Sequence, residues 1–128
     1  MYKFYQVVRS SKAILMNYRV WNLNHTEARA ACREIYTDLV TVYNDEENTA
    51  LINLTNTRLP ANSKVWIGLQ RSQCSSKWSN GDEVTFNNLT ARCGTMPSCA
   101  VMKTNGSWDN ITCTETRNFM CYKQSKYC

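Results

Sequence analysis

Histidine, the side chain that enzymes use most often as a general base, occurs only once in these 128 residues, as His25. We expect His25 to be a surface or half-buried residue beside a helix cap. Glycine occurs four times and proline twice, and no glycine-rich loop that could cradle a phosphate is present. The acidic run Asp45-Glu46-Glu47 suits the first turn of a helix better than it suits an acid–base pair. The sequence therefore predicts that the protein is not an enzyme.

Long apolar runs are also absent. No segment approaches the ~18 apolar residues that a membrane-spanning helix needs. Near the start of the chain, Lys3, Arg9 and Lys12 interrupt the apolar run that a signal peptide would need. If the protein is extracellular, we expect its export signal or membrane anchor to lie outside this stretch of sequence.

Positive charge is in excess but is not concentrated. The formal net charge is +5, from 15 lysines and arginines against 10 acidic residues. The basic residues are scattered and form no stripe along one expected helix, which nucleic-acid binding usually needs. We therefore predict no nucleic-acid partner and a solvated, mildly basic surface with a weak preference for anionic partners such as acidic glycans.

Cysteine, by contrast, is abundant, with seven residues in a short chain. This number indicates an oxidising compartment in which disulfides persist. A zinc site is the alternative, but the sequence has no Cys-x-x-Cys pair and only one histidine. Five glycosylation sequons agree with a secretory history. They begin at Asn24, Asn53, Asn88, Asn105 and Asn110.

The first helix is expected after a short extended segment at Tyr18–Val20. Either Asn24 or Thr26 can cap it, and Glu27 follows in the first turn. Four residues at helical spacing form its buried face: Ala28, Ala31, Cys32 and Ile35. Cys32 should therefore point toward the core.

A second helix is expected after the β-branched run 39–42, which predicts a strand. Asn44 with Glu47 three residues later has the pattern of a capping box. Three residues give this helix its buried stripe: Ala50, Leu51 and Leu54. Pro60 lies shortly past its expected end.

The second half of the chain is rich in short strands and turns. The apolar run 65–69 contains Gly68, which indicates a close backbone approach or a bulge. Asn80-Gly81 and Asn105-Gly106 predict turns. Residues 99–102 and 119–122 predict two buried strands. Helices early and strands late indicate an α+β fold, with helices packed on antiparallel sheet.

The order of these motifs resembles the C-type lectin-like domain. The matching features are the helix with Cys32, then Trp66-Ile67-Gly68-Leu69, Trp78, Gly81, Phe86, Cys99, Gly106-x-Trp108, Cys113 and Phe119-Met120-Cys121. The resemblance covers residues 18–123, with 1–17 as an N-terminal segment or linker and 124–128 as a C-terminal tail. It implies two helices, small antiparallel sheets and a short loop region pinned by a disulfide.

The resemblance also implies how the cysteines pair. Cys32 should bond Cys121, and Cys99 should bond Cys113. The remaining pair on either side of the loop region, Cys74 and Cys93, could form a third bridge. Cys128 is then left over and available for an intermolecular disulfide.

Sugar-binding members of this family hold calcium with a Glu-Pro-Asn or Gln-Pro-Asp tripeptide, a nearby acid and a Trp-Asn-Asp tripeptide. This sequence has none of these patterns intact. No acidic residue lies between Glu83 and Asp109, and the last tripeptide reads Trp108-Asp109-Asn110. Calcium needs about six to eight oxygens, and one carboxylate with one amide does not supply them. We therefore expect no metal or other cofactor, with core packing for Trp108 and a turn at Asp109 and Asn110.

The resemblance implies an extracellular recognition module that binds a carbohydrate or glycoprotein ligand without calcium. One alternative is a purely protein-binding module, such as a receptor ectodomain, and another is a calcium-dependent lectin that uses Asp109 and Asn110. The candidate ligand-binding residues are Trp108, Asp109, Asn110, Arg92, Met96 and Pro97. The aromatic side chains on which a sugar could stack are Tyr2, Tyr5, Trp21, Tyr36, Tyr43, Tyr122 and Tyr127.

Overall fold

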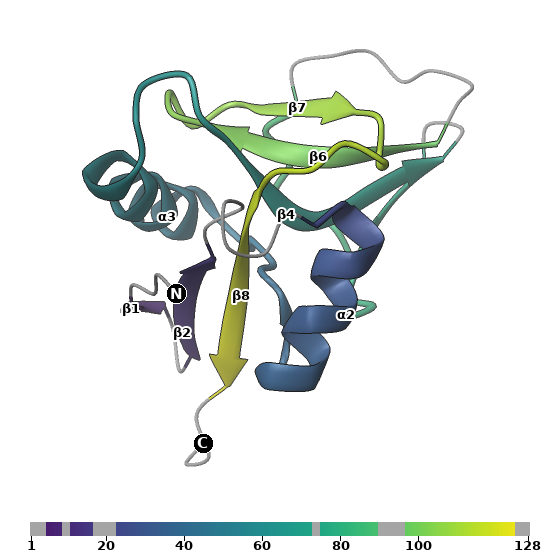
Figure 1. Cartoon of the computed structure of the whole chain (residues 1–128), viewed down its shortest axis with the longest axis horizontal. Helices are drawn as coiled ribbons and strands as arrows, with labels where there is room; N and C mark the ends of the chain where they lie inside the picture. Colours follow the sequence, from purple (N-terminus) through teal and green to yellow (C-terminus); the bar gives the residue numbers. More distant parts are fainter. Residues whose placement is uncertain (1–4, 9–10, 17–22, 73–74, 90–96, 125–128) are drawn as a thin grey trace.

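The computed structural model describes residues 5–8, 11–16, 23–72, 75–89 and 97–124 (Figure 1). The helices are α2 (His25–Ile35) and α3 (Asp45–Arg58). The strands are β1 (Tyr5–Val8), β2 (Ser11–Met16), β3 (Asp38–Leu39), β4 (Lys64–Ser72), β5 (Ser75–Trp78), β6 (Ser98–Lys103), β7 (Trp108–Ile111) and β8 (Asn118–Gln124). No helix among these residues is long and apolar enough to cross a membrane. The predicted α+β fold is confirmed.

The strands form one sheet in the order β1-β2-β8-β4-β6-β7, with β3 beside β8 and β5 beside β4. The pairings are antiparallel except that of β4 with β8, which is parallel. Figure 1 shows β8 running down the middle of the molecule, with α3 toward one side and α2 toward the other. The long strand β4 extends from near α3 to the opposite end of the molecule.

Both helices begin at an asparagine cap. The Asn24 side chain accepts from Glu27 N, and Glu27 accepts from Asn24 N, so α2 has a complete capping box and the cap is Asn24. At α3, Asn44 accepts from Glu47 N at 2.8 Å. The Glu47 carboxylate does not return to the cap but accepts from Tyr43 N, so only half of the predicted box forms.

The buried face of α2 is shorter than predicted. Ala28 and Cys32 are fully buried, but Ile35 is 44% exposed. Thr37, two residues later, is already bonded to Tyr122 near the end of β8. Ile35 therefore lies at the end of the sheet. The helical spacing of apolar residues includes Ile35, but the sheet does not extend far enough to bury it.

Residues 1–17, assigned from sequence to an N-terminal segment or linker, contain β1 and β2. The strand β2 pairs with β8 from Ser11 opposite Gln124 to Met16 opposite Phe119. Its residues 13–16 are almost completely buried. The strand expected at 18–20 lies outside the described residues. We therefore propose that the domain begins before β2 rather than at residue 18.

The strand expected at 39–42 is reduced to the two residues of β3. Val40 donates its N–H to Met120 O of β8 but accepts from Gly68 N of β4. A residue bonded to two different strands does not continue one ladder, which is why β3 ends. A Cβ on Gly68 would lie 2.9 Å from Val40 O, and the β4–β6 register shifts between Trp66 and Gln70. Of the two alternatives predicted at Gly68, the close backbone approach is confirmed.

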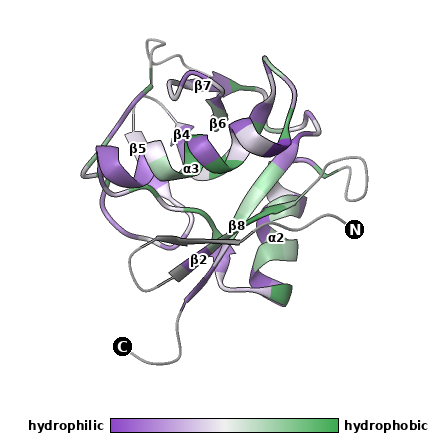
Figure 2. Ribbon diagram, turned by 90° about the vertical axis from the view of Figure 1, so that its left-hand side faces the viewer, coloured by the Kyte–Doolittle hydropathy of each residue, from purple (hydrophilic) through white to green (hydrophobic). Residues whose placement is uncertain are grey.

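The core has two parts. One cluster joins α3 to the sheet through Leu51 and Leu54, and the other joins α2 through Ala28 and Cys32. Figure 2 looks onto α3, whose ribbon alternates between hydrophilic and hydrophobic residues because only one side of it packs inward.

Two of the expected disulfides are present. The Cys32–Cys121 bond links α2 to β8, and the Cys99–Cys113 bond links β6 to the segment after β7. Both predicted pairings are confirmed. Cys74, Cys93 and Cys128 lie outside the described residues, so their pairing stays a prediction.

Candidate functional site

Trp108 belongs to the core. It is completely buried, and its ring packs edge-on against the rings of Trp78 and Phe86. Its indole Nε1 donates to Asn48 Oδ1 of α3 at 2.8 Å. The predicted core role is therefore confirmed, and Trp108 offers no surface to a ligand, so its inclusion among the binding candidates is wrong.

Asp109 and Asn110 lie inside β7, opposite Val101 and Ala100, so the turn predicted for them is wrong. The sequence argument missed the strand because Asp and Asn are typical turn residues, whereas here the β6 ladder fixes their backbone. Asp109 Oδ2 is 3.8 Å from Lys64 Nζ, and both side chains are half-buried. A cation placed at Asp109 would compete with this lysine. Within the described ranges, no group of three or more His, Cys, Asp or Glu side chains could hold a metal ion.

A pocket of about 350 Å³ lies at the far end of β4. Its walls are Gln70, Arg71, Ser72, Ser75, Lys77, Pro97, Ser98 and Cys113. The β4–β5 hairpin places Gln70 opposite Lys77, and β6 places Ser98 opposite Arg71. The Cys99–Cys113 disulfide brings the segment after β7 against the same wall. Three strands and one disulfide therefore fix the shape of the pocket.

The pocket wall is basic and rich in hydrogen-bonding groups. Arg71 and Lys77 come from paired strands, and none of the lining residues that the structure describes is acidic or aromatic. The Arg71 side chain donates from Nε to Ser76 Oγ at 3.3 Å, a contact that orients the guanidinium plane. An arginine fork beside a lysine and serine hydroxyls suits a carboxylate or another oxyanion.

Sequence reasoning found only one residue of this pocket, Pro97. Arg92 and Met96 lie outside the described residues. Arg71 and Lys77 were counted among scattered charges, because only the folded hairpin brings them to the same pocket. The register pairs Arg71 with Ser76 and Lys77 with Gln70, so the two basic side chains start from alternate faces of the hairpin. The signal that could have found them is their placement on either side of a short hairpin between Trp66-Ile67-Gly68-Leu69 and Trp78.

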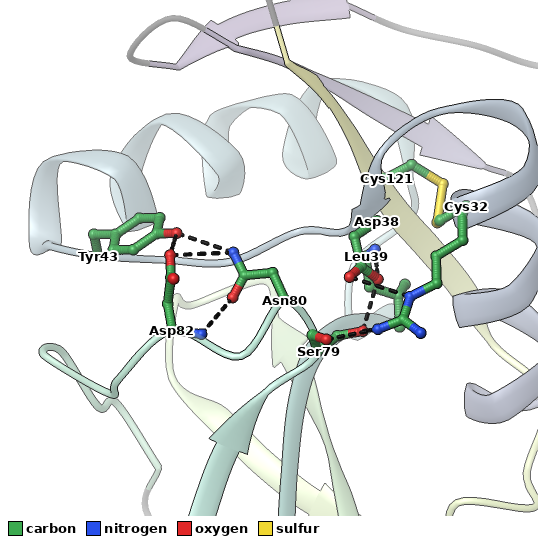
Figure 3. Close-up of polar contacts among 9 residues, drawn as sticks. Cys32, Asp38, Leu39, Tyr43, Ser79, Asn80, Asp82 and Cys121 are labelled. Carbon is green, nitrogen blue, oxygen red and sulfur yellow. Dashed lines mark hydrogen bonds and ion pairs between the residues drawn. A yellow bond between two sulfur atoms is a disulfide. The ribbon is translucent and has the colours of Figure 1, made fainter.

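A polar cluster next to the β5 end involves Tyr43, one of the aromatic candidates for stacking (Figure 3). Its hydroxyl donates to the Asp82 carboxylate and accepts from Asn80 Nδ2 at 3.0 Å. Asn80 Oδ1 in turn accepts from Asp82 N. These groups satisfy one another, so the cluster pins the turn after β5 and does not present Tyr43 to a ligand.

The neighbouring Asp38 is equally engaged. This buried carboxylate accepts from Ser79 Oγ at 2.6 Å and from Leu39 N at 2.8 Å, and Arg33 Nε lies 3.3 Å away. Figure 3 shows Asp38 and Ser79 facing each other across two segments. A carboxylate held by three donors ties β3 to α2 and to the segment after β5.

Among the described side chains, the remaining aromatic candidates do not define a binding surface. Tyr36 and Tyr122 are half-buried and pack against the core clusters. Tyr2, Trp21 and Tyr127 lie outside the described residues, and the side chain of Tyr5 does too.

His25 is fully buried, so the expected surface or half-buried position is wrong. Its Nε2 lies 2.8 Å from Ile67 O, and its ring packs edge-on against Trp66. A carbonyl only accepts, so Nε2 carries the proton, and Nδ1 is buried with no hydrogen-bond partner among the described residues. Burial lowers the pKa of His25, with a smaller effect in the same direction from Arg29. The position of His25 beside a helix cap does not reveal from sequence that its ring packs against β4.

Comparison with known proteins places this geometry in context. A family model described as "Lectin C-type domain" matches residues 22–123. "Snaclec bothroinsularin subunit alpha" of Bothrops insularis is 30% identical over 109 residues, which cover 77% of this chain and 81% of that protein. "Snaclec GPIB-binding protein subunit alpha" of Bothrops jararaca is 36% identical over 91 residues, covering 65% of this chain and 63% of that protein.

Solved structures share the fold at lower identity. Human lithostathine superposes with a TM-score of 0.82 at 20% identity, over 94% of this chain and 88% of that chain. The protein CEL-IV gives a TM-score of 0.82 at 17% identity, over 97% of this chain and 94% of that chain.

Proposed function

Because the chain belongs to the C-type lectin domain family, we propose that it is an extracellular, non-enzymatic recognition module that binds a protein ligand without calcium. We place the ligand's anchor in the pocket between β4, β5 and the start of β6. The observation that carries this proposal is the basic wall of that pocket, none of whose described residues is acidic.

Two further observations support a protein ligand over a calcium-bound sugar. Asp109, the carboxylate available to a calcium site at β7, is paired with Lys64. Stacking of neutral sugars needs an exposed ring, and the described lining of the pocket contains none. One of the relatives carries a name that states GPIB binding, which is consistent with protein recognition in this family.

The chemistry of the pocket favours an acidic anchor on the partner. A carboxylate there could accept from Arg71 or from Lys77, and from a serine hydroxyl. Charge-assisted hydrogen bonds are worth about 1.5–3 kcal/mol each. A specific interface buries roughly 800 Å² per partner, so the pocket would hold one side chain of a wider contact that surrounds it.

The test uses the full chain and cells that bind it. The cells are treated with protease or with glycosidases, and binding is measured in calcium and in chelator. We expect binding to survive the chelator and the glycosidases and to be lost after protease. Loss of binding in chelator, or after glycosidase treatment, would contradict the proposal and favour the glycan alternatives.

A pair of variants locates the site. Arg71→Gln with Lys77→Gln should weaken binding roughly 10–100-fold, because each tenfold change corresponds to about 1.4 kcal/mol. Lys123→Gln, an exposed charge on β8 that does not line the pocket, is the matched control and should leave binding unchanged. Equal effects of the two changes would point to general charge attraction and not to the pocket.

A further inference from the structure

The five sequons are not equivalent in the folded chain. An N-linked glycan is joined to the side-chain nitrogen Nδ2, so a folded domain accommodates it only where that atom reaches solvent. A sequon whose Nδ2 makes a buried hydrogen bond, or whose side chain lies between packed segments, cannot be modified without disturbing the fold.

One sequon is occupied by the fold itself. Asn88 donates from Nδ2 to Gly106 O at 2.6 Å, and this contact ties the segment after β5 to the turn between β6 and β7. A glycan on that nitrogen would replace the bond with a bulky group. At Asn110, which is half-buried in β7, the buried atom is Oδ1 and not the Nδ2 that a glycan needs, so this sequon does not enter the proposal.

Asn53 presents the opposite situation. It is exposed on α3. The side of α3 that faces the β6–β7 turn is formed by its neighbours: Asn48 donates to Gly106 O at 3.0 Å and Asn56 donates to Thr104 O at 3.1 Å. Asn53 lies beside this seam and projects from the helix surface.

Asn105 is exposed at the tip of the β6–β7 turn, followed by Gly106 with a φ of +92°. Its Oδ1 accepts from Ser107 N at 3.0 Å and from Ser107 Oγ at 2.7 Å. Because the amide is planar, fixing Oδ1 toward Ser107 directs Nδ2 away from the turn and into solvent.

We propose that Asn53 and Asn105 carry N-linked glycans, whereas Asn88 stays unmodified in the folded protein. Asn24 is half-buried and commits its Oδ1 to the α2 cap, and its state does not bear on the proposal. The proposal rests on the extracellular location given above, since the modification occurs in the secretory pathway.

The two glycans would share one end of the molecule. Asn105 follows the end of β6, where Lys103 pairs with Lys64, whereas the pocket begins at the other end, where Ser98 pairs with Arg71. Five residues of strand separate these ends by roughly 16 Å. Figure 1 shows α3 and the β6–β7 turn at one side and the end of β4 at the other. The glycans would cover the α3 end and leave the pocket open to a partner.

The test maps glycans on the unmutated chain. The whole chain is secreted from a eukaryotic host behind an added leader, so the natural location of the protein does not affect the result. Glycopeptide mass spectrometry should find modified Asn53 and Asn105 and unmodified Asn88. A glycan on Asn88 of the secreted, folded protein, or bare amides at Asn53 and Asn105, would overturn the proposal.

Matched variants give a second readout. Asn53→Gln removes the sequon at Asn53, and Ser107→Ala removes the sequon at Asn105 while keeping Asn105 itself. Each variant should lower the apparent mass of the secreted chain by one glycan. Asn88→Gln should leave the number of glycans unchanged. A loss of one glycan in this last variant would also refute the assignment. Binding of the proposed protein ligand is measured separately, so failure of that function leaves this result intact.

Discussion

Asn48 is a single side chain that ties α3 to two parts of the sheet. Its Nδ2 donates to Gly106 O at 3.0 Å, and its Oδ1 accepts from the buried Nε1 of Trp108 at 2.8 Å. Asn48→Ala would remove both bonds. A buried donor left without a partner costs about 1–3 kcal/mol, and a lost neutral hydrogen bond about 1 kcal/mol. Gly106 O would still accept from Asn88, so losing the bond to Gly106 costs less than leaving Trp108 Nε1 without its acceptor on Asn48.

We therefore expect Asn48→Ala to lower the free energy of unfolding by about 2–4 kcal/mol in urea titrations. The matched control is Asn56→Ala, which removes an exposed bond from the same helix to Thr104 O and should cost no more than about 0.5 kcal/mol. Asn48→Asp would keep the acceptor for Trp108 but bury a charge, so it should also destabilise the fold. Equal losses for Asn48→Ala and Asn56→Ala would refute this reasoning.

Three further predictions concern the rest of the fold. Replacing both Cys32 and Cys121 by alanine opens a loop with a sequence separation of 89 and should lower the free energy of unfolding by about 4–5 kcal/mol in the chain-entropy model. Removing the Cys99–Cys113 disulfide, whose separation is 14, should lower it by about 3 kcal/mol. Urea titration of both variants measures the two losses, and a larger loss for Cys99–Cys113 would contradict the prediction. His25 is the only histidine, and burial holds its pKa below the ordinary value of 6.5, so the unfolded chain binds a proton at this residue more readily than the folded chain does. The free energy of unfolding should therefore be full above about pH 6.5 and fall as the pH drops below it. A flat stability profile from about pH 7.5 to 5.5 would count against the burial of His25. Deleting residues 1–17 removes β1 and β2 from one edge of the sheet, together with the buried residues 13–16. It should abolish cooperative unfolding in circular dichroism, whereas a stable shortened chain would restore the boundary at residue 18.

Short sequence patterns predicted much of the fold. Asparagine caps located the starts of both helices, and Gly68 marked a backbone approach that leaves no room for a Cβ. The motif order indicated both described disulfides, because a family resemblance includes long-range information that propensity lacks. These features depend on neighbours in sequence or on a pattern shared by the whole family.

Features set by long-range register were missed. The β2 strand was assigned to a linker because nothing in its own sequence shows that β8 lies beside it. His25 was expected near the surface, since its packing on Trp66 depends on where α2 meets β4. Arg71 and Lys77 line the same pocket only after β4 and β5 have paired, so the pocket could not be predicted from scattered charges.

The central claim is recognition without calcium, and a thermal melt tests it most directly. Extracellular calcium modules bind the ion at about 10⁻⁴–10⁻³ M, so a real site at a few millimolar calcium would add roughly 1–2 kcal/mol. That corresponds to a rise in Tm of about 3–8 °C for a domain of this size. With Asp109 paired to Lys64, the Tm of the disulfide-intact chain should be the same in calcium and in chelator. A rise of several degrees in calcium that disappears in Asp109→Ala would contradict the account and make the calcium-dependent lectin the leading interpretation.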